Sequence, residues 1–186
     1  MKQALVFLAN GFEEIEAITI VDILRRAGIK VDMCSIHQDL QVEGAHGIKV
    51  KADLLLDELK ESESYDALIT PGGLPGATNL RDNAKVVELF KAFYDREGKT
   101  LASICASPII LQEAGIAPEI VGTCYPGFDR KVGFKEYVKD AVAVDKNVVT
   151  SMGPATAFRL AIELVSILVG EEAAEALRKE TLFQYR

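Results

Sequence analysis

The sequence lacks a basic cluster and has no uninterrupted hydrophobic run long enough to span a bilayer. Lysine and arginine total 21 against 28 aspartates and glutamates, which gives a formal net charge of -7. A negative domain repels phosphate backbones, so we expect no nucleic-acid partner. The long apolar stretch at residues 157–170 is interrupted by Arg159 and Glu163. We therefore expect no membrane partner either.

Cysteine is scarce and shows no paired spacing. The chain has three cysteines, an odd number, which argues against a disulfide framework. The short apolar run at the N-terminus is followed by carboxylates rather than by a cleavage segment, so it is interpreted as a first strand and not as a signal peptide. A cytoplasmic location is the expectation that follows.

Motifs for metals and nucleotide cofactors are also missing. HExxH, CxxC, GxGxxG and Walker patterns do not occur, and no ligand cluster has metal spacing, so we expect neither a metal nor a cofactor. Only two histidines exist, His37 and His46. Both precede Cys105 in a loop-rich region and are interpreted as surface residues. Chain order alone does not exclude either from a Cys–His arrangement, because spatial proximity decides.

What the sequence does contain is apolar residues, 49% of 186. That suits one domain spanning residues 1–186, large enough to bury roughly 70% of its unfolded surface. Apolar runs of strand length alternate with segments of helical periodicity, which predicts an α/β fold with an open, mostly parallel sheet and helices on both faces. The expected strands are 3–9, 30–36, 66–70 and 100–104, the helices 13–28, 84–99, 107–115, 154–170 and 171–181, with loops around a short strand or hairpin at 37–53 and a hairpin or two strands at 136–151.

Ligands in such sheets bind outside the carboxyl ends of the strands. Three stretches follow strands there: NGFEE after the first, PGGLPG after residues 66–70, and CAS after residues 100–104. Cys105 begins the third stretch, among small residues at a predicted strand-to-helix junction. That is the geometry of a nucleophile elbow, in which the amide of the next residue faces a developing oxyanion. A buried, inert thiol is the alternative, and position alone does not decide between them.

The other two stretches favour the chemical interpretation of Cys105. Glycines 72 and 73 allow a tight turn with an exposed amide, the second half of an oxyanion hole. Glu13 and Glu14 are expected to be ordinary first-turn carboxylates. Glu16, about one turn into the helix, can point back toward the neighbouring strand end. Beside a thiolate it would stay neutral and share its proton with the sulfur.

The remaining cysteines are given packing roles. Cys34 lies within a predicted strand and is interpreted as a core residue. Cys124, in the loop GTCYPG, could approach Cys105, but local packing is preferred to a resolving role.

Taken together, these stretches resemble the ThiJ/PfpI family, on the branch that includes the Parkinson-disease protein deglycase and its bacterial relatives. NGFEEIEA resembles the segment with the active-site glutamate, ITPGGLPGATNL the oxyanion loop, ASICASPIIL the cysteine elbow, and VTSMGPATAF the late Gly-Pro segment before the long helix. The resemblance covers nearly the whole chain in one order. It implies a flavodoxin-like, three-layer sandwich that usually forms a homodimer, with the site near the subunit interface.

The resemblance also implies roles for residues. Cys105 maps to the nucleophile and Glu16 to its proton partner, while the backbone amides of Gly73 and Ala106 map to the oxyanion hole. The further lining residues are expected to be Gly72, Tyr125, His46, Gly153 and Pro154.

Two positions depart from the family pattern. Ala106 stands where the protease-like branch has a histidine, which counts against peptidase activity. Tyr125 stands where the deglycase branch often has a histidine, and a phenol is a poor base at neutral pH. His46 falls near a family arginine that lines the site, which makes it a candidate for anion or substrate contact.

The leading hypothesis is a cofactor-independent cysteine enzyme acting on a small reactive carbonyl such as methylglyoxal, of glyoxalase or deglycase type, with a protective role in oxidative stress. The alternative is a non-enzymatic redox sensor or stress chaperone, in which Cys105 is oxidised to a sulfinate. A role in thiamine-precursor metabolism ranks lower, since no thiazole-phosphate pocket is indicated. Amidotransferase-like hydrolysis also ranks low, because no suitably placed histidine follows the elbow.

Overall fold

A seven-stranded sheet forms the centre of the computed structural model, which describes residues 1–183. The strand order is β10-β11-β7-β6-β1-β2-β5, and only β10 runs antiparallel to its neighbour. The strands are β1 (Gln3–Leu8), β2 (Lys30–Ser35), β5 (Leu54–Leu55), β6 (Ala67–Thr70), β7 (Thr100–Ile104), β10 (Val142–Asp145) and β11 (Val148–Ser151).

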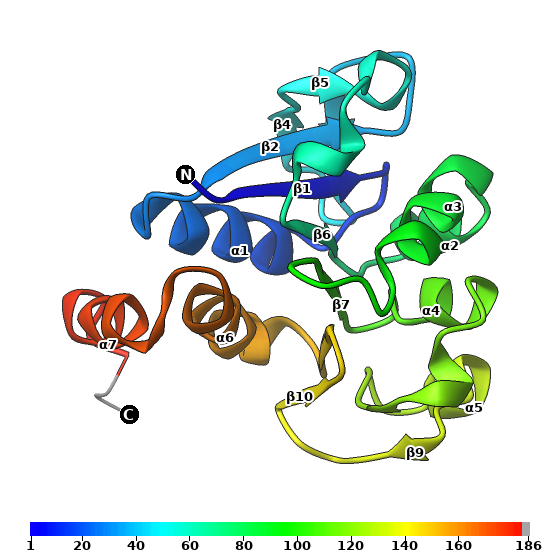
Figure 1. Cartoon of the computed structure of the whole chain (residues 1–186). Helices are drawn as coiled ribbons and strands as arrows, with labels where there is room; N and C mark the ends of the chain where they lie inside the picture. The colour runs from blue at the N-terminus through cyan, green and yellow to red at the C-terminus, as the bar shows by residue number, and fades with distance from the viewer. Residues whose placement is uncertain (184–186) are drawn as a thin grey trace.

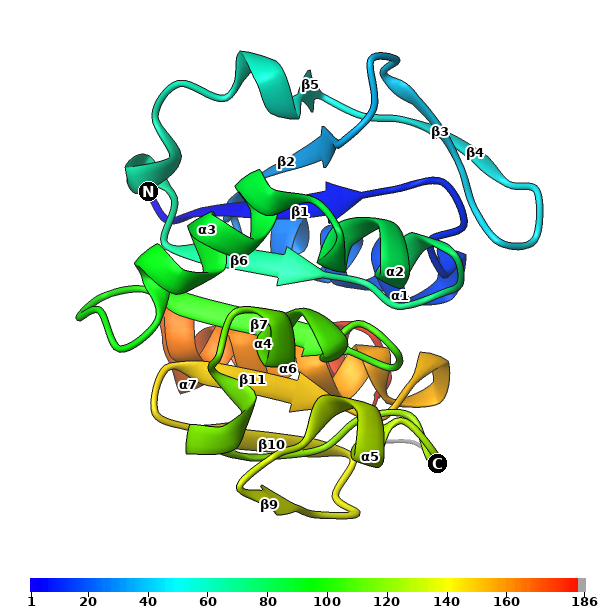
Figure 2. The ribbon, with the colours of Figure 1, turned by 90° about the vertical axis from the view of Figure 1, so that its right-hand side faces the viewer.

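Helices cover both faces of this sheet. Figures 1 and 2 show one group on one face and a second group on the other. The first group is α1 (Glu14–Arg26), α6 (Ala157–Val169) and α7 (Glu171–Glu180); the second is α2 (Gly76–Arg81), α3 (Ala84–Phe93), α4 (Ile109–Glu113) and α5 (Asp129–Val132). The predicted α/β three-layer arrangement is therefore confirmed.

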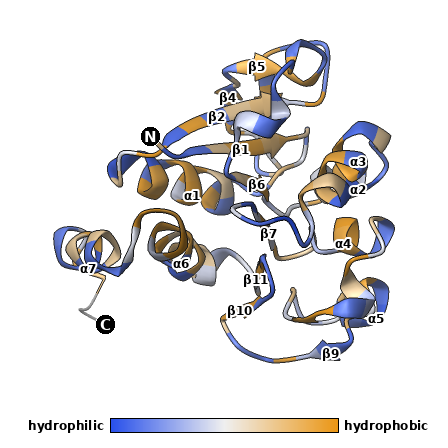
Figure 3. Cartoon of the chain, in the orientation of Figure 1, coloured by the Kyte–Doolittle hydropathy of each residue, from blue (hydrophilic) through white to orange (hydrophobic). Residues whose placement is uncertain are grey.

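Burial explains the apolar runs read from the sequence. Strands β6 and β7 are buried along their whole length, because helices cover both of their faces. Helix α6 packs between α1 and α7, and Figure 3 shows it mostly in hydrophobic colours. Helix α7 packs on α6, and its Glu180 pairs with Arg26 of α1 at 3.1 Å; it carries hydrophilic stretches in the same view.

Several short elements were not predicted. The structure adds α2, α5, β5 and a small pair formed by β8 (Val121–Gly122) and β9 (Glu136–Tyr137). Segments of two to six residues show too few periods for a hydrophobic pattern to reveal them. The expected hairpin in the 37–53 region is present as β3 (Gln41–Glu43) and β4 (Lys49–Lys51).

Two predicted helix boundaries were wrong by three residues or more, and the other helix ends differ by one or two residues at most. The helix expected over 84–99 ends at Phe93, because Tyr94 is extended and Asp95 has a φ of 53°. The long helix expected from 154 starts with a 3₁₀ turn, Pro154–Thr156, and is α-helical only from Ala157. Among residues 1–183, no helix is both long and apolar enough to cross a membrane.

Candidate active site

The three chemistry-bearing stretches meet at the carboxyl edge of the sheet. Strands β1, β6 and β7 are parallel neighbours, so the loops that follow them leave at the same edge. The Glu13 N–H donates to the Gly72 carbonyl at 2.9 Å, which joins the first loop to the second. Gly72 also lies against Cys105, the start of the third. The structure thus brings together what the sequence distributes over about ninety residues.

Cys105 has left-handed backbone geometry. Its φ is 65°, a conformation that costs a side-chain-bearing residue on the order of 1–3 kcal/mol. Both of its backbone groups are held: its N–H donates to Ser151 at 2.9 Å, and its carbonyl accepts from the Tyr125 N–H at 2.8 Å. The end of β11 and the loop at Tyr125 therefore hold the residue in a strained turn, as a nucleophile elbow requires.

The environment of the Cys105 sulfur contains opposing influences. Burial raises the pKa of the thiol, and the neighbouring Glu16 carboxylate raises it further. The backbone N–H groups of Ala106 and Gly73 both donate toward the sulfur and lower its pKa. These are the two amides that the sequence indicated for an oxyanion hole. The thiolate is consequently favoured when the Glu16 carboxyl is neutral.

Glu16 is a buried carboxyl with one satisfied oxygen. Its side chain is inaccessible to solvent, and Oε2 accepts the Gly72 N–H at 2.7 Å. Burial raises the pKa of Glu16 to about 7, the charge of Glu13 raises it too, and the Gly72 N–H and Cys105 oppose the shift. Within residues 1–183, Oε1 makes no hydrogen bond. The carboxyl as a whole is a hydrogen-bond neighbour of the Cys105 thiol, and a proton on it gives a donor beside the sulfur.

Gly72 makes the close approach of these two side chains possible. A Cβ at this position would lie 2.6 Å from the Cβ of Cys105 and 2.8 Å from Oε2 of Glu16. No real side chain fits at those distances. The first glycine of the PGG segment is therefore required by space, in addition to the amide that it offers to Glu16.

Of the predicted lining residues, Tyr125 and Gly153 lie together near the elbow. Tyr125 is 47% exposed, and a Cβ on Gly153 would come within 3.3 Å of its ring. Pro154 follows directly and opens the 3₁₀ turn after β11. Because β11 pairs with β7, this segment leaves the sheet beside Cys105.

Glu14 corrects one expectation. It is not an ordinary exposed carboxylate of a first helical turn, since only 5% of its side chain is accessible. Its Oε2 lies 2.8 Å from Nδ1 of His46, so the structure places His46 against Glu14. Glu13, in contrast, caps α1 by accepting the Glu16 N–H at 2.7 Å. Three carboxylates in one short motif look alike in the sequence, and only the packing of residues 43–48 separates their roles.

Glu13, Glu14 and His46 also form a group whose ligand atoms lie within 4.8 Å of one another. A cation there would compete with the helix cap and with the Glu14–His46 contact. The absence of a metal site stays a prediction.

Cys34 and Cys124 lie in the core, as predicted. Both are inaccessible to solvent, and burial raises the pKa of each thiol to about 12. The charge of Asp129, in α5, also raises the pKa of Cys124.

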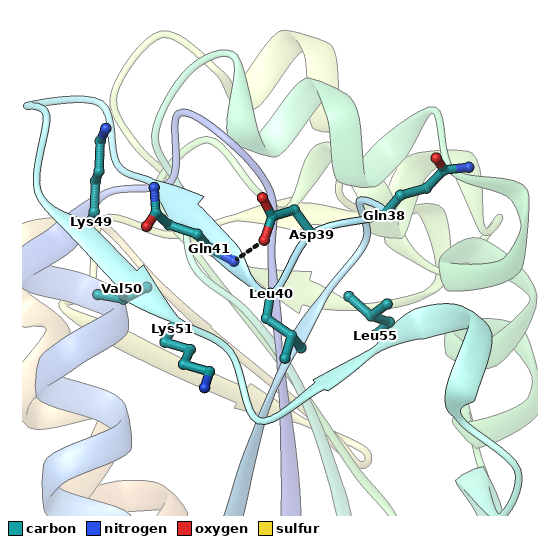
Figure 4. A pocket seen from close by; sticks show the side chains of 8 residues that line it. All are labelled: Gln38, Asp39, Leu40, Gln41, Lys49, Val50, Lys51 and Leu55. Atoms are coloured by element: carbon teal, nitrogen blue, oxygen red, sulfur yellow. Dashed lines mark hydrogen bonds between the residues drawn. The ribbon is translucent and has the colours of Figure 1, made fainter.

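A separate pocket of about 600 Å³ lies beside the β3–β4 hairpin (Figure 4). Its lining includes Lys49, Lys51 and Gln41, whose N–H donates to Asp39 at 2.9 Å. Its lining includes no cysteine and none of the predicted site residues. Chemistry therefore points to the carboxyl edge of the sheet rather than to this pocket.

Comparison with known proteins identifies relatives over the whole chain. The DJ-1/PfpI family matches residues 2–167. Parkinson disease protein 7 homolog of Danio rerio is 37% identical over 182 residues, covering 95% of each chain. Glutathione-independent glyoxalase DJR-1.2 of Caenorhabditis elegans is 34% identical, covering 96% of this chain and 95% of the relative.

Structural comparison agrees. The oxidized DJ-1 of Toxoplasma gondii superposes with a TM-score of 0.91 at 36% identity, covering 98% of both chains. Some relatives are longer: the chain spans 41% and 46% of DJ-1 homologs B and A of Arabidopsis thaliana.

Proposed function

The chain belongs to the DJ-1/PfpI family, and from that premise we propose that it is a cofactor-independent cysteine enzyme acting on small reactive carbonyls such as methylglyoxal. One observation carries the proposal: the Cys105 sulfur, held at a strained elbow, receives two backbone N–H groups and lies beside a buried carboxyl. A relative with 34% identity is named a glutathione-independent glyoxalase. That name supports the same class of substrate.

The proposed reaction begins with addition of the Cys105 thiolate to the aldehyde carbon. A C–S bond forms, and the carbonyl π electrons move to oxygen, where the Gly73 and Ala106 N–H groups stabilise the charge. Glu16 gives its proton to that oxygen, which yields a hemithioacetal. Glu16, now a carboxylate, takes the proton from C1, which gives an enediol. A proton is returned to C2 and the proton on the C1 oxygen passes to the C2 oxygen, so the adduct becomes a thioester of lactate. Water then releases lactate and restores the thiol, so methylglyoxal and water are consumed one for one.

Lactate formation from methylglyoxal tests this function. The wild-type chain is expected to produce lactate, and Cys105→Ala is expected to lose the activity. Cys34→Ala is the matched control, since that thiol lies in the core and away from the elbow. Equal rates for wild type and Cys105→Ala contradict the proposal.

A redox role is the second candidate, supported by the same donors. A sulfinate on Cys105 accepts hydrogen bonds from the two amides and from protonated Glu16, and no histidine is needed. The Toxoplasma gondii relative was solved in an oxidized form. Intact mass spectrometry after mild peroxide is expected to show a gain of two oxygens, mapped to Cys105. Indiscriminate oxidation of all three cysteines argues against this role.

The assembly that we propose is a homodimer. Ile15 and Ile18 are exposed on α1 at helical spacing, and Ile48 is exposed on the hairpin turn that packs against the same helix start. Burial of such a patch by a second copy removes apolar surface from water. Sedimentation of the wild type and of Ile18→Glu distinguishes a dimer from a monomer.

A further inference from the structure

The turn that joins β3 to β4 closes over the Glu14 carboxylate. Oε1 accepts the His46 N–H at 2.6 Å and the Ile48 N–H at 3.5 Å, while Oε2 lies 2.8 Å from Nδ1 of His46. Although 72% of the His46 side chain is exposed, its contact with Glu14 leaves that carboxylate almost fully covered. The carboxylate therefore serves as the anchor for a loop of backbone N–H donors.

Backbone contacts hold the same turn to the segment that precedes α1. The Gly11 N–H donates to Glu43 and the Ala45 N–H donates to Phe12, each at 2.8 Å. At Gly44, a Cβ would overlap the Glu14 carboxyl group. The turn thus fits around this side chain without spare room.

The clasped segment supports the Cys105–Glu16 pair directly. Its Glu13 N–H donates to the Gly72 carbonyl at 2.9 Å, and the Gly72 N–H donates to Glu16 at 2.7 Å. Glu13 also holds the Glu16 N–H at 2.7 Å through its side chain. A shift of residues 11–14 consequently moves the amide and the carboxyl that set the state of the thiol.

We propose that Glu14 is a positioning residue for the Cys105–Glu16 pair, acting by clasping the hairpin turn 43–48 onto the start of α1. The clasp keeps water away from Glu16 and keeps the Gly72 amide on its carboxyl. The titratable groups facing Glu14 are His46 on the turn and Glu13 on its own segment. The inference rests on the proposed function only in assuming that Cys105 is the nucleophile for a carbonyl substrate. The effect of Glu14 on the reactivity of Cys105 is measured without any substrate.

The direction of the effect follows from the burial of Glu16. Loosening the clasp admits water, which lowers the pKa of Glu16, and weakens the Gly72 hydrogen bond, which raises it. Burial is the largest cause of the raised pKa, so the net change is toward the usual range and the carboxyl becomes charged at neutral pH. A charged Glu16 then raises the pKa of the Cys105 thiol. The thiolate becomes rarer, and Cys105 reacts more slowly at pH 7.

Alkylation of Cys105 by iodoacetamide, followed by peptide mass spectrometry between pH 5 and 10, measures this effect. Glu14→Ala is expected to lower the rate at pH 7 about tenfold, equivalent to one unit in the apparent pKa of the thiol. Glu14→Gln keeps an oxygen for the two backbone N–H groups and is expected to restore most of the rate. Glu43→Ala is the matched control: it removes an exposed carboxylate of the same hairpin, one that pairs with the exposed Lys49 at 3.4 Å.

Gly44→Ala tests the clasp from the opposite side. Its methyl group displaces the Glu14 carboxyl, so it is expected to slow alkylation in the same direction even if Glu14→Ala fails to fold. Folding of every variant is checked by thermal denaturation. A wild-type alkylation profile in folded Gly44→Ala overturns the proposal, as does one in folded Glu14→Ala.

The outcome also separates this inference from the proposed function. Slower alkylation in the variants, together with no lactate from the wild type, retains the positioning role and rejects the carbonyl activity. Lactate from the wild type, together with unchanged alkylation in the variants, does the reverse.

Discussion

Glu16 at the carboxyl edge of the parallel sheet and two glutamates at the amino edge have pKa values shifted in opposite directions. At the carboxyl edge, Glu16 is buried without a cation, and its pKa is raised to about 7. At the amino edge, Glu63 and Glu119 are exposed beside Arg96 and Lys146, which hold their pKa values below the usual range. Glutamate is thus buried with a raised pKa at one edge and is a solvated ion-pair partner at the other. Burial, rather than residue type, decides which.

The largest expected effect comes from removing the ionisable carboxyl at the carboxyl edge, by the substitution Glu16→Gln. Glu16→Gln keeps an oxygen for the Gly72 N–H but has no proton to exchange. We expect lactate formation from methylglyoxal to fall by about 10²–10⁴-fold, the range for loss of a general acid–base group. Glu119→Gln, the matched change at the amino edge, is expected to retain wild-type turnover. Similar turnover in the two variants removes Glu16 from the proposed mechanism.

Although Glu16→Gln is expected to lose activity, its free energy of unfolding is expected to rise relative to wild type at neutral pH. Between pH 4.5 and about 7 the unfolded chain releases the Glu16 proton while the folded chain retains it, so the contribution of Glu16 to stability is lost as the pH rises. Glu16→Gln does not ionise and escapes this loss. Its stability relative to wild type is expected to improve between pH 4 and pH 8 by up to about 3 kcal/mol. Urea titrations at the two pH values measure the difference, and a pH-independent difference contradicts it.

A smaller effect on stability is expected from a side chain that crowds Cys105 and Glu16. In Gly72→Ala the new methyl group meets Cys105 and Glu16, and we expect a loss of about 1–3 kcal/mol in the free energy of unfolding. Gly98→Ala provides a contrast in space, because a Cβ there meets no atom within 4 Å. Because Gly98 has a φ of 72°, Gly98→Ala adds backbone strain and lowers stability by itself. It is therefore compared through the rate of Cys105 alkylation, which it is expected to leave unchanged. Gly72→Ala is expected to slow alkylation at pH 7.

The smallest effect is expected at the amino edge. Glu63→Gln removes the exposed pair with Arg96, which lies at 3.1 Å. Solvent screens such pairs, so no measurable shift in the unfolding midpoint is expected at pH 7. Because ion pairing lowers the pKa of Glu63, any contribution it makes is present above pH 4.5 and fades as the pH falls. A large destabilisation by this change contradicts the comparison between the edges.

Much of the site is visible in the sequence because topology places it. The carboxyl ends of neighbouring parallel strands share an edge, so the residues after β1, β6 and β7 had to meet, whatever their separation in the chain. That argument brought Cys105, the glycine pair 72–73 and the Glu13–Glu16 segment to one edge, and the family resemblance then implied the roles of Gly73 and Glu16. It did not indicate the role of Glu14, because hydrophobic periodicity does not show which first-turn carboxylate a distant hairpin will cover. It likewise did not show that His46 packs on Glu14.

The alternation of apolar runs and helical periods by itself determined the layered parallel sheet and the edge at which the candidate site residues lie. Backbone hydrogen bonding and side-chain burial leave few arrangements for such a pattern. Only the tertiary structure decided the proton affinities and the left-handed geometry of Cys105. Desolvation of Glu16 depends on every atom packed around it, and the strain at the elbow persists because Ser151 and Tyr125, far along the chain, hold both backbone groups of Cys105. The pKa of Glu16 and the backbone conformation of Cys105 depend on residues that are distant in the sequence, so no local pattern predicts them.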